Sequence, residues 1–214
     1  MQGRLSEYRV FFKEFLRNFH TTGAILPSGR ALAAALARFV DDGKAGERRI
    51  LEVGPGTGAV TRQIVAAMKS DDRLDLVELN DSFVGQLRQR FEHDETFRPV
   101  ADRARVLHCP VEELREDHVY DLIISGLPLN NFSVAAVEQI LEALLRLLKP
   151  GGVLSFFEYI AVRRARALIS GRAERARLRG IGRAMHRVLE GQEIRRDWIW
   201  PNVPSAWVHH VRPS

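Results

Sequence analysis

The chain has 214 residues, of which 45% are hydrophobic, and it carries a formal net charge of +5. This length and composition fit one domain with its own core, and no internal repeat or low-complexity tract interrupts it. The single cysteine, Cys109, excludes an internal disulfide and is compatible with a reducing compartment. The longest uncharged run, residues 122–137, contains Ser, Gly, Pro and Asn, so a membrane-spanning helix is not expected. We therefore expect a soluble cytoplasmic protein with a single domain over residues 1–214.

A helical extension is predicted at the N-terminus, over residues 1–40. Its first part has an apolar and largely aromatic stripe at helical spacing, formed by Leu5, Tyr8, Phe12, Phe15, Leu16 and Phe19. Basic side chains lie off this stripe, which is typical of an amphipathic helix in a membrane interface. Packing of the stripe onto the protein's own domain is an equally good interpretation. We predict an N-terminal amphipathic helix within a membrane-binding extension.

The stretch RRILEVGPGTG is the most informative part of the chain. Its apolar run predicts a strand, and three glycines (Gly54, Gly56 and Gly58) follow at every second position. Glycine lacks a Cβ, so ligand atoms can lie against the backbone of such a turn. The spacing differs from the dinucleotide fingerprint, and with Glu52 in front it resembles the first motif of Rossmann-like methyltransferases that use S-adenosylmethionine. We expect these four residues to bind that cofactor, with Glu52 near its charged amino-acid end; a tight turn without a ligand is the alternative.

Beyond this turn the sequence alternates between strand and helix patterns, which is typical of a parallel sheet. The predicted strands are residues 50–53, 74–79, 104–107, 119–124, 153–159, 198–200 and 206–211, and the predicted helices are residues 59–68, 82–91 and 134–148. We expect an α/β fold that resembles the Rossmann-like class I methyltransferases. Its sheet should have seven strands, mostly parallel, with helices on both faces.

Ligands of open α/β sheets bind beyond the carboxyl ends of the strands, and several candidates follow such ends. Glu78 lies at the end of the second strand, about twenty residues after the glycine turn, where an acid can accept hydrogen bonds from both ribose hydroxyls. The neighbouring Leu79 belongs to the same predicted site. After the third strand, Pro110 stands where similar methyltransferases often have an aspartate for the adenine amino group. That contact is therefore missing or comes from Glu112, and the backbone of Val111 remains available to the adenine ring.

The predicted catalytic segment is the loop after the fourth strand, which consists of Ser125, Gly126, Leu127 and Pro128. A proline in this loop has no N–H, and it turns neighbouring carbonyls outward. Methyltransferases that act on amino groups use such carbonyls to hold the attacking nitrogen with its lone pair towards the sulfonium. An ordinary connection between strand and helix is the alternative, and it is the weaker one beside the glycine motif.

Residues 19–30, 51–58, 77–80, 125–128 and 200–204 together resemble the bacterial phospholipid N-methyltransferase family. The resemblance implies methyl transfer from S-adenosylmethionine to the amine of phosphatidylethanolamine, in up to three steps, towards phosphatidylcholine. S-adenosylhomocysteine would be the other product. Some similar proteins methylate ornithine lipids, and these residues leave both substrates open.

The resemblance also assigns a role to Tyr159, at the end of the fifth strand, because the family uses a tyrosine there near the headgroup. The surroundings depart from the family, since Glu158 precedes the tyrosine and Ile160 follows it. Methylated ammonium groups bind aromatic faces, and Tyr159 and Phe132 are candidates for this contact.

A basic segment, predicted to be a helical insertion over residues 163–190, concentrates the positive charge of the chain. Between Arg163 and Arg187 it holds nine arginines and one acid, Glu174, which gives +8 and leaves −3 for the rest of the chain (5 − 8). Such a field favours an anionic partner, either lipid headgroups or nucleic acid, although a solvated helix face is the alternative. With the family resemblance, we expect a monomer that docks on the anionic inner face of the cytoplasmic membrane and takes a phospholipid substrate.

No metal site is expected, because His209 and His210 alternate across a strand and the other histidines lack ligand spacing. A dedicated base is not obvious, and His20 is a weak candidate. The rival enzyme class is a nucleic-acid methyltransferase that resembles the ribosomal RNA adenine N6-dimethylases, which share the glycine motif and a Leu-Pro loop. Here Gly126 precedes Leu127, where those enzymes usually have Asn, so no nucleic-acid substrate is expected. A membrane-binding module without catalysis is the non-enzyme alternative.

Overall fold

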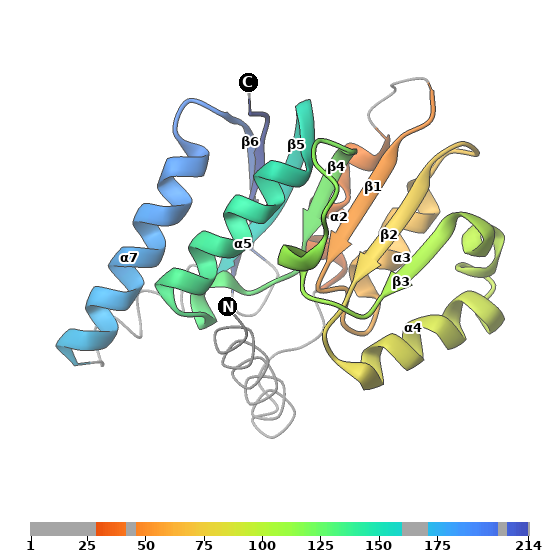
Figure 1. The fold of residues 1–214 in the computed structure, drawn as a ribbon, viewed down its shortest axis with the longest axis horizontal. Helices are drawn as coiled ribbons and strands as arrows, with labels where there is room; N and C mark the ends of the chain where they lie inside the picture. Colours follow the sequence, from red (N-terminus) through yellow and green to blue (C-terminus); the bar gives the residue numbers. More distant parts are fainter. Residues whose placement is uncertain (1–28, 42–45, 160–170, 201–204, 214) are drawn as a thin grey trace.

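The computed structural model describes residues 29–41, 46–159, 171–200 and 205–213. Within these ranges the strands form one seven-stranded sheet with the order β3-β2-β1-β4-β5-β7-β6 (Figure 1). Strands β1 to β5 run parallel to one another, and β7 is antiparallel to both β5 and β6. The strands are β1 (Arg49–Val53), β2 (Arg73–Val77), β3 (Ala104–Leu107), β4 (Tyr120–Ser125), β5 (Leu148–Tyr159), β6 (Glu193–Ile199) and β7 (Ala206–Val211).

Helices cover both faces of the sheet, as predicted. In Figure 1, α5 and α7 lie together in front of the sheet, and they share one hydrophobic core with its front face. The helices α2, α3 and α4 contribute to a second core on the other face. The α-helices are α2 (Arg30–Leu36), α3 (Ala59–Ala67), α4 (Asp81–His93), α5 (Val134–Leu147) and α7 (Arg172–Leu189), and the short 3-10 helices are η1 (Arg38–Asp41), η2 (Arg98–Arg103), η3 (Val111–Glu113) and η4 (Leu129–Asn131).

The predicted helices form because of local capping and amphipathic spacing. The side chain of Asn80 accepts a hydrogen bond from the N–H of Phe83 and caps α4, and Ser133 caps α5 in the same way. The buried positions of α5 follow the helical repeat. They are Val137, Ile140, Leu141, Ala143, Leu144 and Leu147.

Two strands begin earlier than the sequence predicts. β5 begins at Leu148, which pairs with Tyr120, whereas Leu122 pairs with Val153, so β5 bulges around Gly151, whose φ is +73°. The segment Lys149-Pro150-Gly151-Gly152, which cannot continue a helix, therefore follows the end of α5 without interrupting the strand. β6 begins at Glu193 and pairs only with β7. Most of this edge strand is partly exposed on both faces, so its sequence lacks the alternation by which strands are recognised.

The described part of the predicted N-terminal extension packs into the domain. Leu32, Leu36 and Val40 are fully buried in the core behind the sheet. The aromatic stripe of residues 5–19 lies outside the described residues, so its membrane role stays a prediction. No helix in the described ranges is long and apolar enough to span a membrane.

The described part of the basic segment is α7, which makes the connection from β5 to β6. Both strands are antiparallel to β7 and thus parallel to each other, and parallel strands need a crossover connection, usually a helix. The stripe with Leu178, Ile181 and Met185 is buried and packs towards α5. The arginines of α7 lie mainly on its exposed side.

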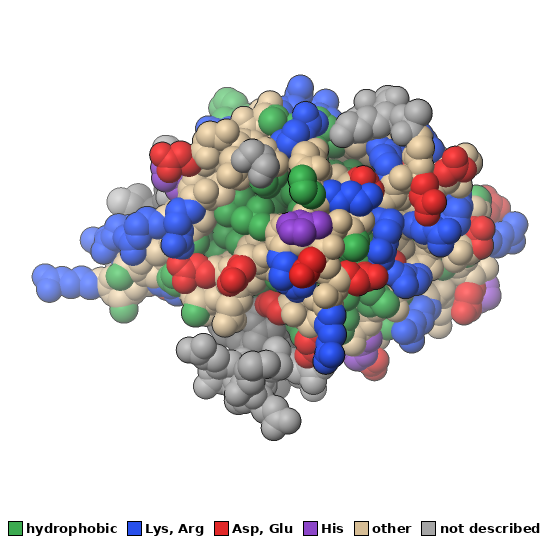
Figure 2. All heavy atoms as spheres, turned by 45° about the horizontal axis from the view of Figure 1, so that its top comes forward, with side chains coloured by type: hydrophobic (Ala, Val, Ile, Leu, Met, Phe, Trp, Pro, Cys, Tyr) green, Lys and Arg blue, Asp and Glu red, His purple; other side chains and the backbone are tan. Residues whose placement is uncertain are grey.

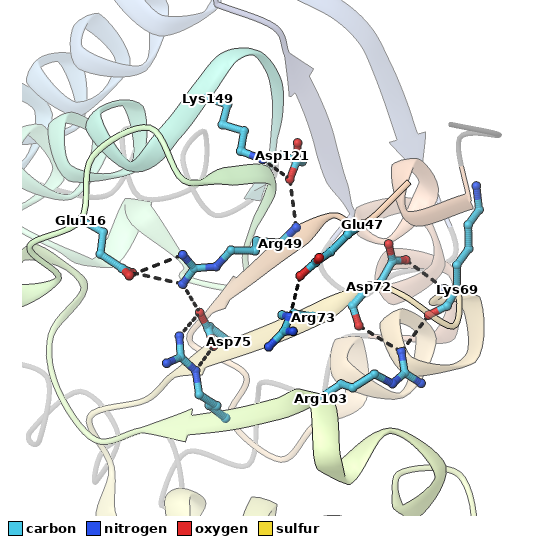
Figure 3. Close-up of polar contacts among 11 residues, drawn as sticks. Glu47, Arg49, Lys69, Asp72, Arg73, Asp75, Arg103, Glu116, Asp121 and Lys149 are labelled. Atoms are coloured by element: carbon cyan, nitrogen blue, oxygen red, sulfur yellow. Dashed lines mark hydrogen bonds and ion pairs between the residues drawn. The ribbon is translucent and has the colours of Figure 1, made fainter. Parts of the chain in front are cut away.

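A charge network ties the amino-terminal ends of the strands together (Figure 3). Asp75 is 4% exposed and accepts hydrogen bonds from Arg105 at 2.7 Å, Arg49 at 3.1 Å and the Tyr120 hydroxyl at 2.8 Å. Burial alone would raise the pKa of Asp75, but these hydrogen bonds lower it. Figure 2 shows basic and acidic side chains intermingled on this side of the molecule. Because these ionisable groups satisfy one another, we interpret this edge as structural.

Candidate active site

The glycine turn leaves β1 with a backbone that only glycine adopts without strain. Gly54, Gly56 and Gly58 have φ values of +72°, +55° and +81°. A Cβ on Gly54 would lie 2.5 Å from Leu127, and one on Gly58 would lie 3.3 Å from Leu87. A Cβ on Gly56 would have no described atom within 4 Å. Gly54 and Gly58 therefore permit close packing, whereas Gly56 faces open space in which a ligand can approach the backbone.

Glu78 holds the glycine turn against the end of β2. Its side chain accepts hydrogen bonds from the N–H of Gly56 at 3.0 Å and from those of Leu79 and Asn80 at 2.8 Å each. Burial raises the pKa of Glu78, although these hydrogen bonds oppose the rise. A carboxylate has about four lone-pair sites and these three N–H groups use three of them, so Glu78 can accept one more hydrogen bond, such as one from a ribose hydroxyl. Asn80 is the helix cap, and its backbone, rather than its side chain, contacts Glu78.

Glu52 is a fully buried acid below the glycine turn. One carboxyl oxygen accepts a hydrogen bond from the Thr61 hydroxyl at 2.7 Å, and the other has no partner among the described residues. Burial raises the pKa of Glu52 to about 8, the Thr61 hydrogen bond opposes this shift, and the nearby Glu78 adds to it. The side chain is therefore largely protonated at neutral pH, and an arriving cation would favour its ionisation. The sequence alone did not identify Thr61, whose only signal is a hydroxyl in the first turn of α3.

The segment after β3 provides the predicted adenine end of the site. Val111 begins η3, is 2% exposed, and its carbonyl accepts a hydrogen bond from Leu114. The carbonyl of Pro110 accepts one from Glu113. Glu112 has a buried carboxyl oxygen without a partner in the described part of the chain, and burial raises its pKa. This arrangement favours Glu112, rather than the occupied carbonyls, as the polar contact for an adenine amino group.

The loop after β4 lies directly against the glycine turn. The N–H of Gly126 donates to the carbonyl of Val53 at 2.8 Å, and a Cβ on Gly126 would lie 2.7 Å from the carbonyl oxygen of Gly54. The N–H of Leu127 lies 3.4 Å from the Ser125 hydroxyl, and Pro128 leads into η4. The predicted catalytic loop and the predicted cofactor turn are thus brought together, and glycine at 126 is a condition for their contact.

Asn130, which the sequence did not single out, joins this loop to the end of β5. It is 3% exposed, and its side-chain nitrogen lies 3.4 Å from the carbonyl oxygen of Tyr159, whereas its Oδ1 is buried without a described partner. Arg177 of α7 donates hydrogen bonds to the carbonyls of Asn130 and Phe132 and so fixes the loop. An unpaired buried acceptor at this position is suited to a donor that arrives with the substrate.

The two aromatic candidates do not share a pocket. Tyr159 is 6% exposed, packs edge-on against Phe157 at 5.0 Å, and belongs to the core behind the sheet. Burial raises its pKa to about 12. Phe132 is fully buried in the other core, against α5 and α7. The predicted cation–π role of Phe132 is therefore wrong for this arrangement, because neighbouring side chains already cover its ring.

The histidines show no metal site in the described ranges. His209 contacts Glu193 at 2.6 Å, whereas His210 contacts Ser155 at 2.8 Å and Asp197 at 3.3 Å. No group of three metal-binding side chains occurs among the described residues. His20, the weak candidate for a base, lies outside them.

Comparisons with known proteins agree with this fold. Residues 50–152 match the family model described as a methyltransferase domain. The chain is 24% identical to the ornithine lipid N-methyltransferase of Singulisphaera acidiphila over 151 residues, which are 71% of this chain and 77% of that protein. It is 41% identical to ribosomal RNA small subunit methyltransferase A of Synechococcus elongatus over 85 residues, but these are only 40% of this chain and 26% of that protein.

A solved structure extends the likeness over almost the whole chain. The 1,6-didemethyltoxoflavin-N1-methyltransferase of Burkholderia thailandensis, solved with S-adenosylhomocysteine, has a TM-score of 0.63 at 15% identity and covers 98% of this chain and 90% of its own. The predicted Rossmann-like fold is therefore confirmed. Residues 50–152 therefore carry a methyltransferase domain, and the predicted cofactor of this domain is S-adenosylmethionine.

Residues of the described site fit this cofactor. The open backbone at Gly56 can take its amino-acid end, with the unpaired oxygen of Glu52 below for the ammonium group. Glu78 can accept a hydrogen bond from a ribose hydroxyl, and Glu112 can accept one from the adenine amino group. When bound, the cofactor supplies the electrophilic methyl group.

Proposed function

We propose that this methyltransferase acts on the headgroup amine of a membrane lipid, either phosphatidylethanolamine and its methylated forms or an ornithine lipid. The observation that carries the proposal is the buried Oδ1 of Asn130, an acceptor without a described partner beside the loop of residues 126–128. An amine that still carries N–H groups can donate to such an acceptor while its lone pair remains free for attack.

The chemistry of the site supports an amine better than a hydroxyl substrate. A hydroxyl needs a base to become a nucleophile, whereas a neutral amine attacks a sulfonium directly. Tyr159 is a poor base, because burial raises its pKa to about 12 and the phenol keeps its proton. Positioning by the loop and exclusion of water can then supply much of the rate. The lipid ammonium must lose its proton to water before it attacks.

Two observations support a lipid as the carrier of this amine. The relative from Singulisphaera acidiphila is named as an ornithine lipid N-methyltransferase, and this chain covers 77% of its length. The exposed side of α7 carries arginines that suit an anionic surface, with Arg172, Arg175 and Arg179 among them. We therefore propose peripheral association with the inner face of the cytoplasmic membrane. The ribosomal RNA relative matches a smaller part of this chain, so RNA is the rival substrate.

The test is methyl transfer from labelled S-adenosylmethionine to lipid vesicles and to ribosomal RNA, offered separately. We expect label in phosphatidylethanolamine or ornithine lipid and none in RNA. Asn130→Leu should lower the rate by roughly 10- to 100-fold, which corresponds to the loss of one buried hydrogen bond, with cofactor affinity unchanged. Label in RNA alone, or an Asn130→Leu protein with the full rate, would contradict the proposal.

A further inference from the structure

A second concave site lies between α7 and the antiparallel edge of the sheet. It is a groove of about 670 Å³, and one wall is α7 while the other is formed by β5, β6 and β7. It lies away from the glycine turn, which follows β1, but Glu158 in its wall directly precedes Tyr159. Nothing in the proposed methyl-transfer site uses this groove.

The two walls of the groove carry opposite charges. Arg179 and Arg183 stand one helical turn apart on α7, both exposed, and neither has an ion-pair partner among the described residues. On the strand wall, Glu158 contributes a carboxylate that lies 3.9 Å from His209. Arg196 is less available, because Glu193 pairs with it at 2.6 Å. A purely anionic ligand would be attracted by the arginines of the helix wall but repelled by Glu158.

A buried histidine at the strand wall lacks one hydrogen-bond partner. His209 is 4% exposed, and its Nδ1 is bonded to Glu193 at 2.6 Å, but its Nε2, which lies 3.9 Å from the Glu158 carboxylate, has no hydrogen-bond partner in the described structure. Orphaned buried polar atoms are uncommon in folded proteins and indicate an absent partner such as a ligand or water. This atom is independent of the arginines and marks the groove as a place where a polar group fits.

Aromatic rings line and flank the same groove. Trp207 is part of the strand wall, and Arg196 lies over its ring at 5.7 Å. Trp198 contacts Trp207 at 5.5 Å between ring centroids and is 56% exposed, and Trp200 beyond it is 71% exposed. Exposed tryptophans are costly to leave in water and are typical of binding surfaces for partly apolar ligands. Their faces also attract quaternary ammonium groups.

We infer that this groove binds the zwitterionic phosphate–ammonium headgroup of a phospholipid. The phosphate would pair with Arg179 and Arg183, because guanidinium groups bind phosphate oxygens in a bidentate manner. The ammonium end would face Glu158, on the wall that Trp207 also lines. The site would hold a headgroup next to the end of β5, before or after methylation. The choice of lipid rests on the proposed function, whereas the existence of the site does not.

Soluble headgroup probes test this inference, and the protein supplies its own signal. The three tryptophans of the chain are Trp198, Trp200 and Trp207, so intrinsic fluorescence should respond when the groove fills. The full chain is titrated with glycerophosphocholine, with glycerol 3-phosphate as the anionic half and with choline as the cationic half. We expect glycerophosphocholine to bind at least about tenfold more tightly than either half, because both charges contribute.

A pair of matched double variants locates the binding. Replacing Arg179 and Arg183 by Gln should weaken glycerophosphocholine binding at least about tenfold, since two charge-assisted contacts are lost. Replacing Arg172 and Arg175 by Gln removes the same charge from the same helix outside the groove lining. This variant should leave the binding of the soluble probe unchanged, although it should weaken docking on anionic vesicles. Equal binding of glycerol 3-phosphate and glycerophosphocholine, equal loss in both double variants, or no binding of any probe would overturn the inference.

Methyl transfer to lipid vesicles, measured on the same samples, separates the two proposals. Probe binding that depends on Arg179 and Arg183, without methylation of any lipid, would leave the groove intact and defeat the proposed function. Lipid methylation without such binding would defeat the groove alone.

Discussion

Replacing Glu52 by Gln is predicted to change how the stability of the protein depends on pH. Burial raises the pKa of Glu52 from an ordinary 4.5 to about 8 in the folded chain. Between these values the folded chain holds a proton that the unfolded chain has lost, so the free energy of unfolding falls as pH rises. The contribution is complete below the unfolded pKa and is lost as pH passes about 8. The two values are 3.5 units apart (8 − 4.5), which limits the total effect to roughly 5 kcal/mol.

Glutamine has nearly the same shape as a protonated glutamate, so Glu52→Gln can keep the contact with Thr61 and has no proton to lose. The variant should therefore become more stable relative to wild type as pH rises, by up to about 1.4 kcal/mol per unit within this window. Urea unfolding at several pH values between about 5 and 8 measures the difference. Glu95→Gln makes the same substitution at an exposed position, and the stability of this variant should depend on pH as that of the wild type does. A stability difference between Glu52→Gln and wild type that stays constant or shrinks with rising pH would refute the assignment of a buried, protonated Glu52.

Three further substitutions test the site and the fold. Gly56→Val should abolish cofactor binding while unfolding stays cooperative, because its side chain would enter the open space above the turn; titration calorimetry that finds normal affinity in the folded variant would place the cofactor elsewhere. Gly126→Ala should cost about 1–3 kcal/mol of stability, because its Cβ would lie 2.7 Å from the Gly54 carbonyl, and urea unfolding with no loss would show that the two loops separate easily. Asp75→Asn should cost about 1–3 kcal/mol, because the buried side chain loses its charge-assisted hydrogen bonds to the partly exposed Arg105 and Arg49, and urea unfolding with no loss would show that the network of Figure 3 does not stabilise the fold.

The order of the fold could be predicted from the sequence because its signals are local. The glycine spacing after β1, the alternation of strand and helix patterns, and the apolar spacing of residues 134–147 each depend on a few neighbouring residues. The early start of β6 at Glu193 could not be predicted in this way. That strand exists because β7 offers an edge with which to pair, and its own residues are mostly charged.

In the candidate site, too, only the residues with local sequence signals could be predicted. Glu52, Glu78 and the glycines are recognisable because a fixed spacing places them at strand ends. The unpaired Oδ1 of Asn130 depends on the approach of β5, and the groove depends on packing of α7 beside β7. Residue types alone also could not show that Phe132 faces the core, because burial is decided by tertiary packing.

The most direct test of the central claim is mass spectrometry of lipids after incubation with the protein and S-adenosylmethionine. Phosphatidylethanolamine, phosphatidylcholine and phosphatidylglycerol differ in what their headgroups offer: an amine, a fully methylated ammonium and hydroxyl groups only. Ornithine lipid is included as the second amine substrate. We expect a mass increase of one or more methyl groups in phosphatidylethanolamine or ornithine lipid, and no change in the other two lipids. A methyl group on phosphatidylglycerol, or no methylated amine lipid from protein that binds S-adenosylmethionine, would contradict the proposed function.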